Sequence, residues 1–165
     1  MCDPAWLPTL YYLNDYDGDW DNFLNAVYAV FRRDFITSQP KFQGCWVRCI
    51  RNPVERNKEE GFWHCIQGND ANAVPEPPRM ERIEWIRAMI ENINDPNIDC
   101  WENQRGREPR WSIWFREEFL VVLVEKTRKR DGFRAFLLLT AYDTPREHTR
   151  RKLRNERDTA LGRNV

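Results

Sequence analysis

The sequence predicts an α+β fold, in which N-terminal, middle and C-terminal helices pack on a mostly antiparallel sheet of about five strands. Two runs, Phe119–Val124 and Phe136–Leu139, are apolar on both faces, as expected of central strands covered on two sides. The order of elements along the chain is helix, two strands, helix, three strands, helix, which is typical of this class. The chain has 165 residues, a length that fits one domain.

The first 18 residues are predicted to form an acidic extended arm, and residues 19–165 to form the single α+β domain. The arm contains no Lys or Arg and two prolines, which prevent a long helix, and its aromatic residues are expected to lie on the body. Asp19 can cap a helix that begins at Trp20 and follows the spacing of one apolar helical face.

Two strands and a helix are expected in the middle of the chain. Residues 42–51 and 61–67 are predicted to be strands that a charged solvent loop connects. Alternation along the second strand places His64 on an otherwise apolar face. After a proline-rich loop, apolar residues at helical spacing predict a helix over residues 79–94.

The C-terminal third is expected to supply most of the sheet. Residues Trp101–Glu108 are predicted to form a polar loop, followed by strands at about 110–115, 118–126 and 133–142. A basic turn between the last two strands indicates a hairpin.

A helix is predicted after the last strand. Thr144 is expected to cap it, Pro145 to occupy its first position and Glu147 to complete a capping box, and the helix continues to about Ala160.

Composition excludes several classes of protein. Twenty-six basic residues balance 26 acidic ones, which excludes a uniformly basic, histone-like polymer binder. The charge is split, however, because residues 1–100 carry 10 basic and 16 acidic groups and residues 101–165 carry 16 and 10. Such asymmetry points to contact with a polyanion. No apolar run reaches the length of a membrane span. The first residues do not read as a secretory signal, and an odd number of cysteines (five) fits reduced thiols in a cytoplasmic protein.

Sequence motifs exclude some further chemistry. The chain contains no phosphate-binding glycine loop, no dinucleotide fingerprint and no nucleophile elbow. On a strand, Cys45 and Cys49 would be about 13 Å apart, too far to share one zinc ion. We therefore expect no metal site.

His64, Thr140 and Tyr142 are the first candidates for catalysis. Imidazole titrates near neutrality and can transfer protons, although a core histidine with one hydrogen bond is the alternative. Thr140 and Tyr142 share a parity with Phe136 and Leu138, so the last strand is expected to change from apolar to hydroxyl-bearing on one face at its end. Alternatively, these two residues only terminate the core.

Arginines form the second group of candidates, because a guanidinium can hold a phosphate with two hydrogen bonds. They lie on the predicted middle helix and before the third strand, and 21 of the 26 basic residues in the chain are arginines. For each one, solvation or stacking on a tryptophan is the simpler interpretation. The candidates are Arg79, Arg82, Arg87, Arg105, Arg107 and Arg110.

Together, these patterns resemble the barnase–EndoU–colicin E5/D–RelE (BECR) superfamily of small metal-independent RNases, in particular its phage and bacterial toxin branch. The resemblance covers about residues 60–155 and is one of spacing and element order. The segments that carry it are Phe62-Trp63-His64, Arg79-x-x-Arg82-Ile83-x-Trp85, Trp101-Glu102-Asn103 with Arg110-Trp111, and Leu139-Thr140-Ala141-Tyr142.

The resemblance implies RNA cleavage without a metal or other cofactor, in which the ribose 2′-hydroxyl attacks the adjacent phosphate. His64 would take the hydroxyl proton, and Arg82 and Arg110 would stabilise the phosphate charge. Tyr142 or Thr140 would donate a proton to the leaving 5′-oxygen or hold the phosphate. The expected RNA-binding residues are Arg79, Arg87, Arg107, Arg150 and Arg151 for the backbone, and Trp101 or Trp111 for a base.

Two functions remain open. The first is an endoribonuclease toxin or phage nuclease, which a protein inhibitor holds in check. The second is a non-catalytic protein-binding module, such as an antitoxin, an immunity protein or a phage-assembly protein. The acidic N-terminal segment and the zero net charge fit the second function equally well.

Overall fold

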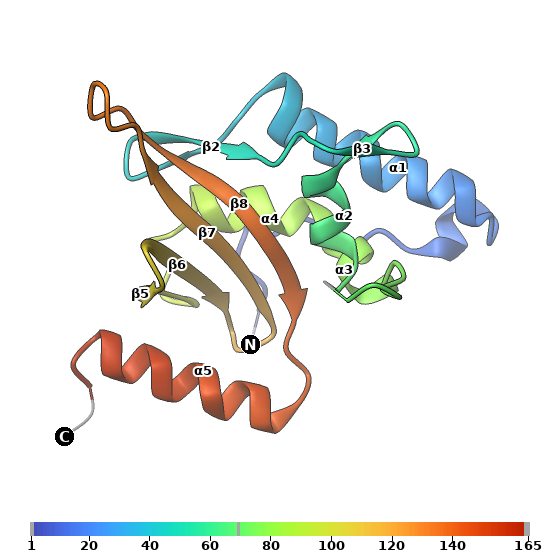
Figure 1. Cartoon of the computed structure of the whole chain (residues 1–165). Coiled ribbons are helices and arrows are strands. Elements are labelled where there is room, and N and C mark those ends of the chain that lie inside the picture. Colours follow the sequence, from blue (N-terminus) through green and yellow to red (C-terminus); the bar gives the residue numbers. More distant parts are fainter. Residues whose placement is uncertain (1, 69, 164–165) are drawn as a thin grey trace.

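A six-stranded sheet organises the computed structural model, which describes residues 2–68 and 70–163 (Figure 1). The strand order is β1-β2-β8-β7-β6-β5. Helices pack on this sheet, so the α+β class is confirmed, but the sheet is mixed because β2 and β8 run parallel. The strands are β1 Lys41–Phe42, β2 Cys45–Cys49, β5 Ile98–Arg105, β6 Glu108–Phe115, β7 Phe119–Thr127 and β8 Arg134–Asp143; β3 Val54–Glu55 and β4 Lys58–Glu59 form a separate ribbon.

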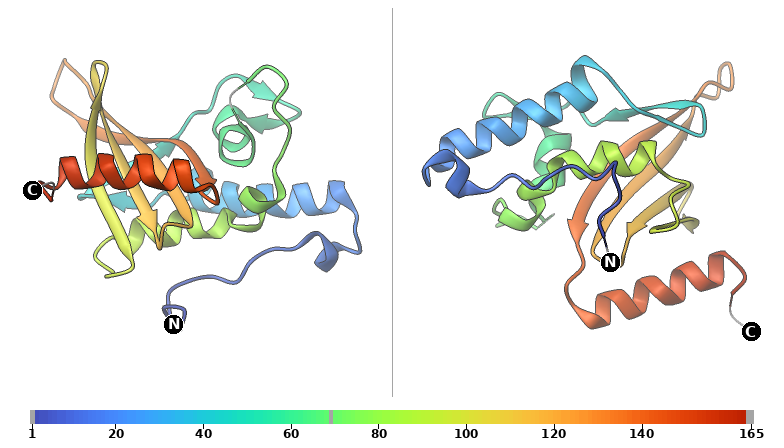
Figure 2. Two further views of the ribbon diagram at one scale, coloured as in Figure 1. Left: turned by 90° about the horizontal axis from the view of Figure 1, so that it is seen from below. Right: turned by 180° about the vertical axis from the view of Figure 1, so that it is seen from behind.

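The helices lie on both sides of the sheet. In Figure 1, α5 lies below the sheet, and α1 and α4 lie on its other side (see also Figure 2). Asp19 accepts a hydrogen bond from the Asn22 amide, which confirms the expected cap of α1. The helices are α1 Trp20–Arg32 with a π-helical turn Arg33–Thr37, α2 Glu60–Ile66, α3 Pro77–Glu81, α4 Ile83–Glu91 and α5 Glu147–Ala160.

Residues that pair across neighbouring strands lie on the same face of the sheet, so the pairing assigns each strand residue to an inner or an outer face. The inner face packs with α1, α2 and α4 into the main hydrophobic core, to which β8 contributes Phe136, Leu138 and Ala141. The outer face carries a smaller cluster in which Leu153 of α5 packs on Trp101 and other strand residues. α5 therefore covers one part of the outer face.

A β-bulge in β8 changes which face its last residues use. Val122 pairs with Thr140, whereas the next residue of β7, Leu123, pairs with Leu138, so Leu139 is an additional residue. The predicted shared face of Thr140, Tyr142 and Leu138 is therefore wrong: Leu138 is in the inner core, and the two hydroxyl residues face outward.

The predicted strand over residues 61–67 is also wrong, because this segment is helix α2. Its buried residues, Phe62, Trp63, Cys65 and Ile66, have the one-, three- and four-residue spacing of a helical face rather than strict alternation. Gly61 fixes the start of the helix, since its amide donates to the Ile50 carbonyl oxygen at 2.8 Å.

The predicted polar loop Trp101–Glu108 is largely strand β5 and its turn into β6. β5 is an edge strand that pairs only with β6 and carries several polar residues, so it lacks the apolar run of a central strand.

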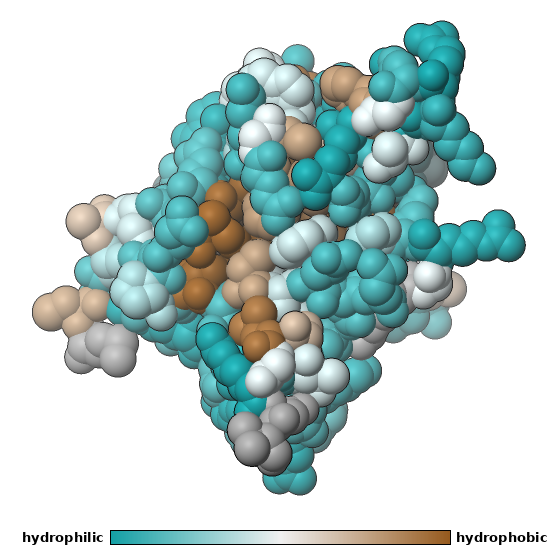
Figure 3. Space-filling view, turned by 90° about the vertical axis from the view of Figure 1, so that its left-hand side faces the viewer, coloured by the Kyte–Doolittle hydropathy of each residue, from teal (hydrophilic) through white to brown (hydrophobic). Residues whose placement is uncertain are grey.

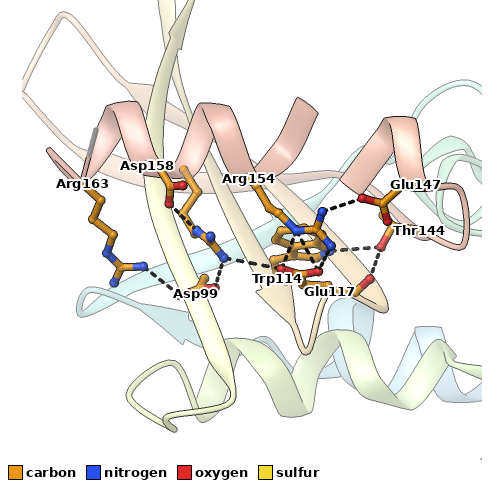
Figure 4. Close-up of polar contacts among 9 residues, drawn as sticks. Asp99, Trp114, Glu117, Thr144, Glu147, Arg154, Asp158 and Arg163 are labelled. Atoms are coloured by element: carbon orange, nitrogen blue, oxygen red, sulfur yellow. Dashed lines mark hydrogen bonds and ion pairs between the residues drawn. The ribbon is translucent and has the colours of Figure 1, made fainter. Parts of the chain in front are cut away.

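The predicted capping box of the last helix does not form, because α5 begins at Glu147 and its N-cap residue is Arg146. The Thr144 hydroxyl is used elsewhere: it accepts a hydrogen bond from Trp114 Nε1 at 3.1 Å and donates one to the Glu117 carbonyl oxygen at 2.7 Å (Figure 4). Thr144 thus joins the start of α5 to the turn between β6 and β7.

The N-terminal segment lies on the body across the back of the molecule (Figure 2, right). A short 3₁₀ helix, Leu13–Tyr16, interrupts its extended part. Trp6 Nε1 donates to Asp95 at 2.7 Å, and the Tyr11 hydroxyl donates to Glu84 at 2.9 Å. Burial and this carboxylate raise the pKa of Tyr11 to about 12. The segment is therefore held by specific contacts with α4 and the loop after it.

Candidate functional site

Thr140 lies at the centre of the candidate site, near the C-terminal end of β8. The parallel partner of β8, β2, ends opposite Leu138, so the later residues of β8 form an open edge on that side. Helix α2 packs there, and the Thr140 hydroxyl donates to the His64 carbonyl oxygen at 2.8 Å. Thr140 therefore connects the strand directly to the helix that carries His64.

The His64 side chain is partly accessible, with 28% of its surface exposed. Its Nε2 atom lies 3.4 Å from a carboxylate oxygen of Glu60, one helical turn earlier. A carboxylate beside an imidazole can orient the ring. His64 therefore contacts Thr140 through its backbone, whereas its imidazole lies beside Glu60.

Arg79 reaches this strand end from α3. One of its terminal nitrogens donates to the Gln67 carbonyl oxygen at 2.9 Å and to the Ala141 carbonyl oxygen at 3.4 Å. Its guanidinium carbon lies 5.4 Å from the centre of the Tyr142 ring, a cation–π distance. Only 13% of the Arg79 side chain is exposed, and it also pairs with Glu76, so its first role is to hold α2, α3 and β8 together.

A groove of about 420 Å³ opens between the outer sheet face and α5. Three predicted residues, Arg110, Thr140 and Tyr142, line it, and α5 adds His148 and Lys152 from the opposite side. The remaining lining residues are Asn103, Ser112, Leu120, Val122, Leu139, Thr149, Leu153 and Glu156. The groove thus combines one imidazole, two cations, several hydroxyl groups and an apolar floor.

His148 was not among the sequence candidates. It is exposed, yet it borders the groove one helical turn before Lys152. His148 and Lys152 are four residues apart, which places them on one side of a helix. This spacing is the sequence signal that could have identified His148.

Two predicted arginines lie away from the groove, among contacts of the middle helices. Arg82 donates to the Pro78 carbonyl oxygen at 3.0 Å, and its guanidinium carbon lies 5.1 Å from the centre of the Trp85 ring. Arg87 pairs with Glu91 and donates to the Asp34 backbone.

The other sequence candidates are dispersed. Arg107 is exposed in the turn between β5 and β6. Trp101 is buried, and its Nε1 donates to Glu156 at 3.2 Å, so the ring has no accessible face for a base. Trp111 faces inward, with its ring 5.5 Å from that of Phe42.

The basic residues of α5 divide into two groups. Arg154 and Arg157 point to the sheet edge, where they form ion pairs with Glu117 and Asp99 (Figure 4). Hydrogen bonds from Arg154 lower the pKa of Glu117. Arg150 donates to the Thr144 carbonyl oxygen at 2.7 Å, and Arg151 is exposed. Only part of this helix is thus available to an external anion.

The five cysteines are free. Burial raises the pKa of Cys49 to about 11 and that of Cys100 to about 12, and it raises the pKa of the buried Cys65 as well. Within residues 2–68 and 70–163, no three His, Cys, Asp or Glu side chains are grouped as ligands of one metal ion. The same part of the chain has no helix with the length and apolar character needed to span a membrane.

Comparison with known proteins found no matching family model, no matching curated protein and no matching solved structure. The function must therefore be argued from the geometry of the site.

Proposed function

We propose that the protein is a metal-independent endoribonuclease whose active site lies at the C-terminal end of β8. One observation carries the proposal: Thr140 both lines the groove and is hydrogen-bonded to the backbone of His64. His148 lines the same groove, and His64 lies on the helix that Thr140 contacts, although its imidazole is not among the groups that line the groove. Arg110 and Lys152 add positive charge to the same groove.

The residues match the tasks of RNA cleavage by internal attack. The 2′-oxygen bonds to the phosphorus while the bond to the 5′-oxygen breaks, which yields a 2′,3′-cyclic phosphate and a free 5′-hydroxyl. An imidazole, His64 or His148, accepts the 2′-hydroxyl proton, and Tyr142 or the other imidazole returns a proton to the leaving oxygen. Arg110 stabilises the charge that develops on the phosphate oxygens.

Such an activity would damage the RNA of the cell that makes the protein. A protein inhibitor that covers the groove, in the manner of an antitoxin or immunity protein, is therefore part of the proposal. The exposed cations Arg151 and Lys152 on α5 would suit an acidic inhibitor surface.

The test is cleavage of single-stranded RNA by the purified protein in the presence of EDTA. We expect products that end in a 2′,3′-cyclic phosphate, detected by mass spectrometry, and no cleavage of the all-deoxy analogue. His64→Ala, His148→Ala and Tyr142→Phe separate the proton-transfer roles, and loss of a true participant lowers kcat by about 10²–10⁴-fold. Arg32→Ala, at an exposed position of helix α1, is the matched control and should remain fully active.

Three results would contradict the proposal. These are intact RNA after incubation with the wild-type protein, loss of cleavage in EDTA, and cleavage like that of the wild type by all three site variants. Stable complex formation with a protein, without RNA turnover, would instead favour a non-catalytic binding module.

A further inference from the structure

The outer sheet face continues beyond the groove as one cross-strand row. The pairings Asn103–Arg110, Arg110–Val124, Val124–Leu137 and Leu137–Arg48 place these five residues side by side across β5, β6, β7, β8 and β2. Asn103 and Arg110 line the groove, whereas Leu137 and Arg48 line a second hollow. A single row of side chains therefore joins the two cavities.

The second hollow has a volume of about 570 Å³ and lies at the base of the β7–β8 hairpin. Its exposed aromatic residue is Phe133, of which 41% is exposed, whereas Phe136 is buried. The guanidinium carbons of Arg48 and Arg128 lie 5.6 and 5.2 Å from the centre of this ring. The other lining residues are Lys126, Thr127, Ala135, Phe136 and Leu137.

Charge along this row is positive at both cavities. Lys126 and Arg128 have acidic partners, Glu108 and Asp131. By contrast, within the described part of the chain neither Arg48 nor Arg110 has a carboxylate within 4.0 Å. At a strand spacing of about 4.8 Å, the Cα atoms of these two arginines are about 14 Å apart.

Small apolar and aromatic groups lie between and beside the two arginines. Val124 and Leu137 form the middle of the row. Trp46, 44% exposed, projects from the same side of β2 as Arg48, with the Lys41 ammonium 4.5 Å from its ring centre. Figure 3, a view of one side of the molecule, shows a mainly hydrophilic surface with a band of hydrophobic residues near its middle. Apolar positions that are flanked by cations suit a ligand that alternates bases with phosphates.

We infer that this row is a track for single-stranded RNA, which extends from the groove to the second hollow. Arg110 and Arg48 contact phosphates, and Phe133 stacks on an unpaired base. The inference rests on the proposed nuclease function and adds its substrate class. Unpaired bases expose the ring faces that an aromatic side chain can stack on, whereas a duplex hides them. Binding would be salt-dependent, since each phosphate contact releases counterions.

The test measures binding separately from cleavage. The probe is a fluorescent, unstructured 2′-O-methyl oligoribonucleotide of about 12 nucleotides, a length within the site sizes of single-strand binders. It has no free 2′-hydroxyl and stays intact. Fluorescence anisotropy over a series of salt concentrations gives its affinity, and a dinucleotide probe reports on the groove alone.

For the long probe, Phe133→Ala should weaken binding about tenfold through lost stacking. Arg48→Ala should lower the slope of log affinity against log salt by about 0.7, whereas Arg48→Lys should keep the slope. Arg32→Ala is the charge-matched control and should bind like the wild type. Dinucleotide binding and the cleavage of short RNA should be unchanged in all four variants.

The outcomes distinguish the two proposals. Binding of the long probe that depends on Arg48 and Phe133, without cleavage of unmodified RNA, would support the track and overturn only the nuclease. Cleavage with unchanged long-probe binding in both variants would overturn only the track. Failure of the wild-type protein to bind the long probe would overturn the track. The track would also be overturned if a poly-glutamate peptide competed with the long probe and its binding depended on Arg48 and Phe133 in the same way.

Discussion

Replacing Thr144 with valine should loosen the attachment of α5 to the sheet. Only 1% of Thr144 is exposed, and its hydroxyl joins the Trp114 indole nitrogen to the Glu117 carbonyl oxygen. Valine has nearly the same shape, so packing is kept while both hydrogen bonds are lost. The substitution thereby isolates the polar contribution of this junction.

The magnitude follows from the two groups left behind. A buried donor or acceptor without a partner costs about 1–3 kcal/mol. Trp114 is as buried as Thr144, whereas the Glu117 carbonyl lies in a turn that water can reach in part, so we expect a loss of about 2–4 kcal/mol in the free energy of unfolding. In a chain of this size, that corresponds to a decrease in Tm of about 5–15 °C.

Urea unfolding followed by tryptophan fluorescence measures this loss. Thr144→Ser is the control, because it keeps the hydroxyl and removes only a methyl group, and it should lose about 1 kcal/mol. A loss below about 0.5 kcal/mol for Thr144→Val, or an equal loss for both variants, would refute the hydrogen-bond argument.

Three further predictions concern stability and reactivity. Arg154 lowers the pKa of Glu117, so the ionised pair stabilises the fold at pH values above the ordinary pKa of a glutamate. This contribution is lost as the pH falls through the lowered pKa of Glu117. Arg154→Gln should therefore flatten the decrease of Tm between about pH 5 and pH 3. Gly61→Ala should destabilise the fold by at least about 1 kcal/mol in urea unfolding, since the added Cβ would lie 2.9 Å from the Ile50 backbone nitrogen and oxygen. The exposed Cys2 should react with iodoacetamide well before the buried thiols, as peptide mass mapping of briefly labelled native protein can check.

Local sequence patterns correctly predicted the elements whose stabilising contacts lie close together in the chain. The apolar runs in β7 and β8 and the turn between them are where they were predicted. Asp19 caps α1 because its hydrogen bond spans only three residues. In each case the determining contacts lie close together in the chain or repeat regularly along it.

The failures arise where distant residues compete for the same group or where a segment is short. Thr144 has the sequence of a helix cap, but Trp114, 30 residues away, takes its hydroxyl. Helix α2 has seven residues, too few for periodicity to separate a helix from a strand, although the four-residue spacing of Glu60 and His64 was a hint.

The candidate site was predicted in part. Thr140, Tyr142 and Arg110 were selected from the sequence and line one groove, whereas His64 meets this strand end through its backbone carbonyl and is not among the lining residues. Arg82 and Arg87 were selected for their residue type, but they serve contacts among helices. Convergence depends on how α5 crosses the sheet, which the pattern of a single helix does not encode.

The extra residue in β8 decides which chemical groups the end of this strand presents to solvent. If pairing continued unbroken past Leu138, Thr140 and Tyr142 would point into the helical layer and Ala141 would lie beneath α5. Removing Leu139 would take away the bulge but leave Thr140 next to Leu138 and still opposite Val122, so the hydroxyls would keep their side. The outward hydroxyls therefore depend on one residue that is left out of the pairing: if Leu139 instead lay opposite Val122, two hydroxyls would be placed in the interior and a methyl group would face α5.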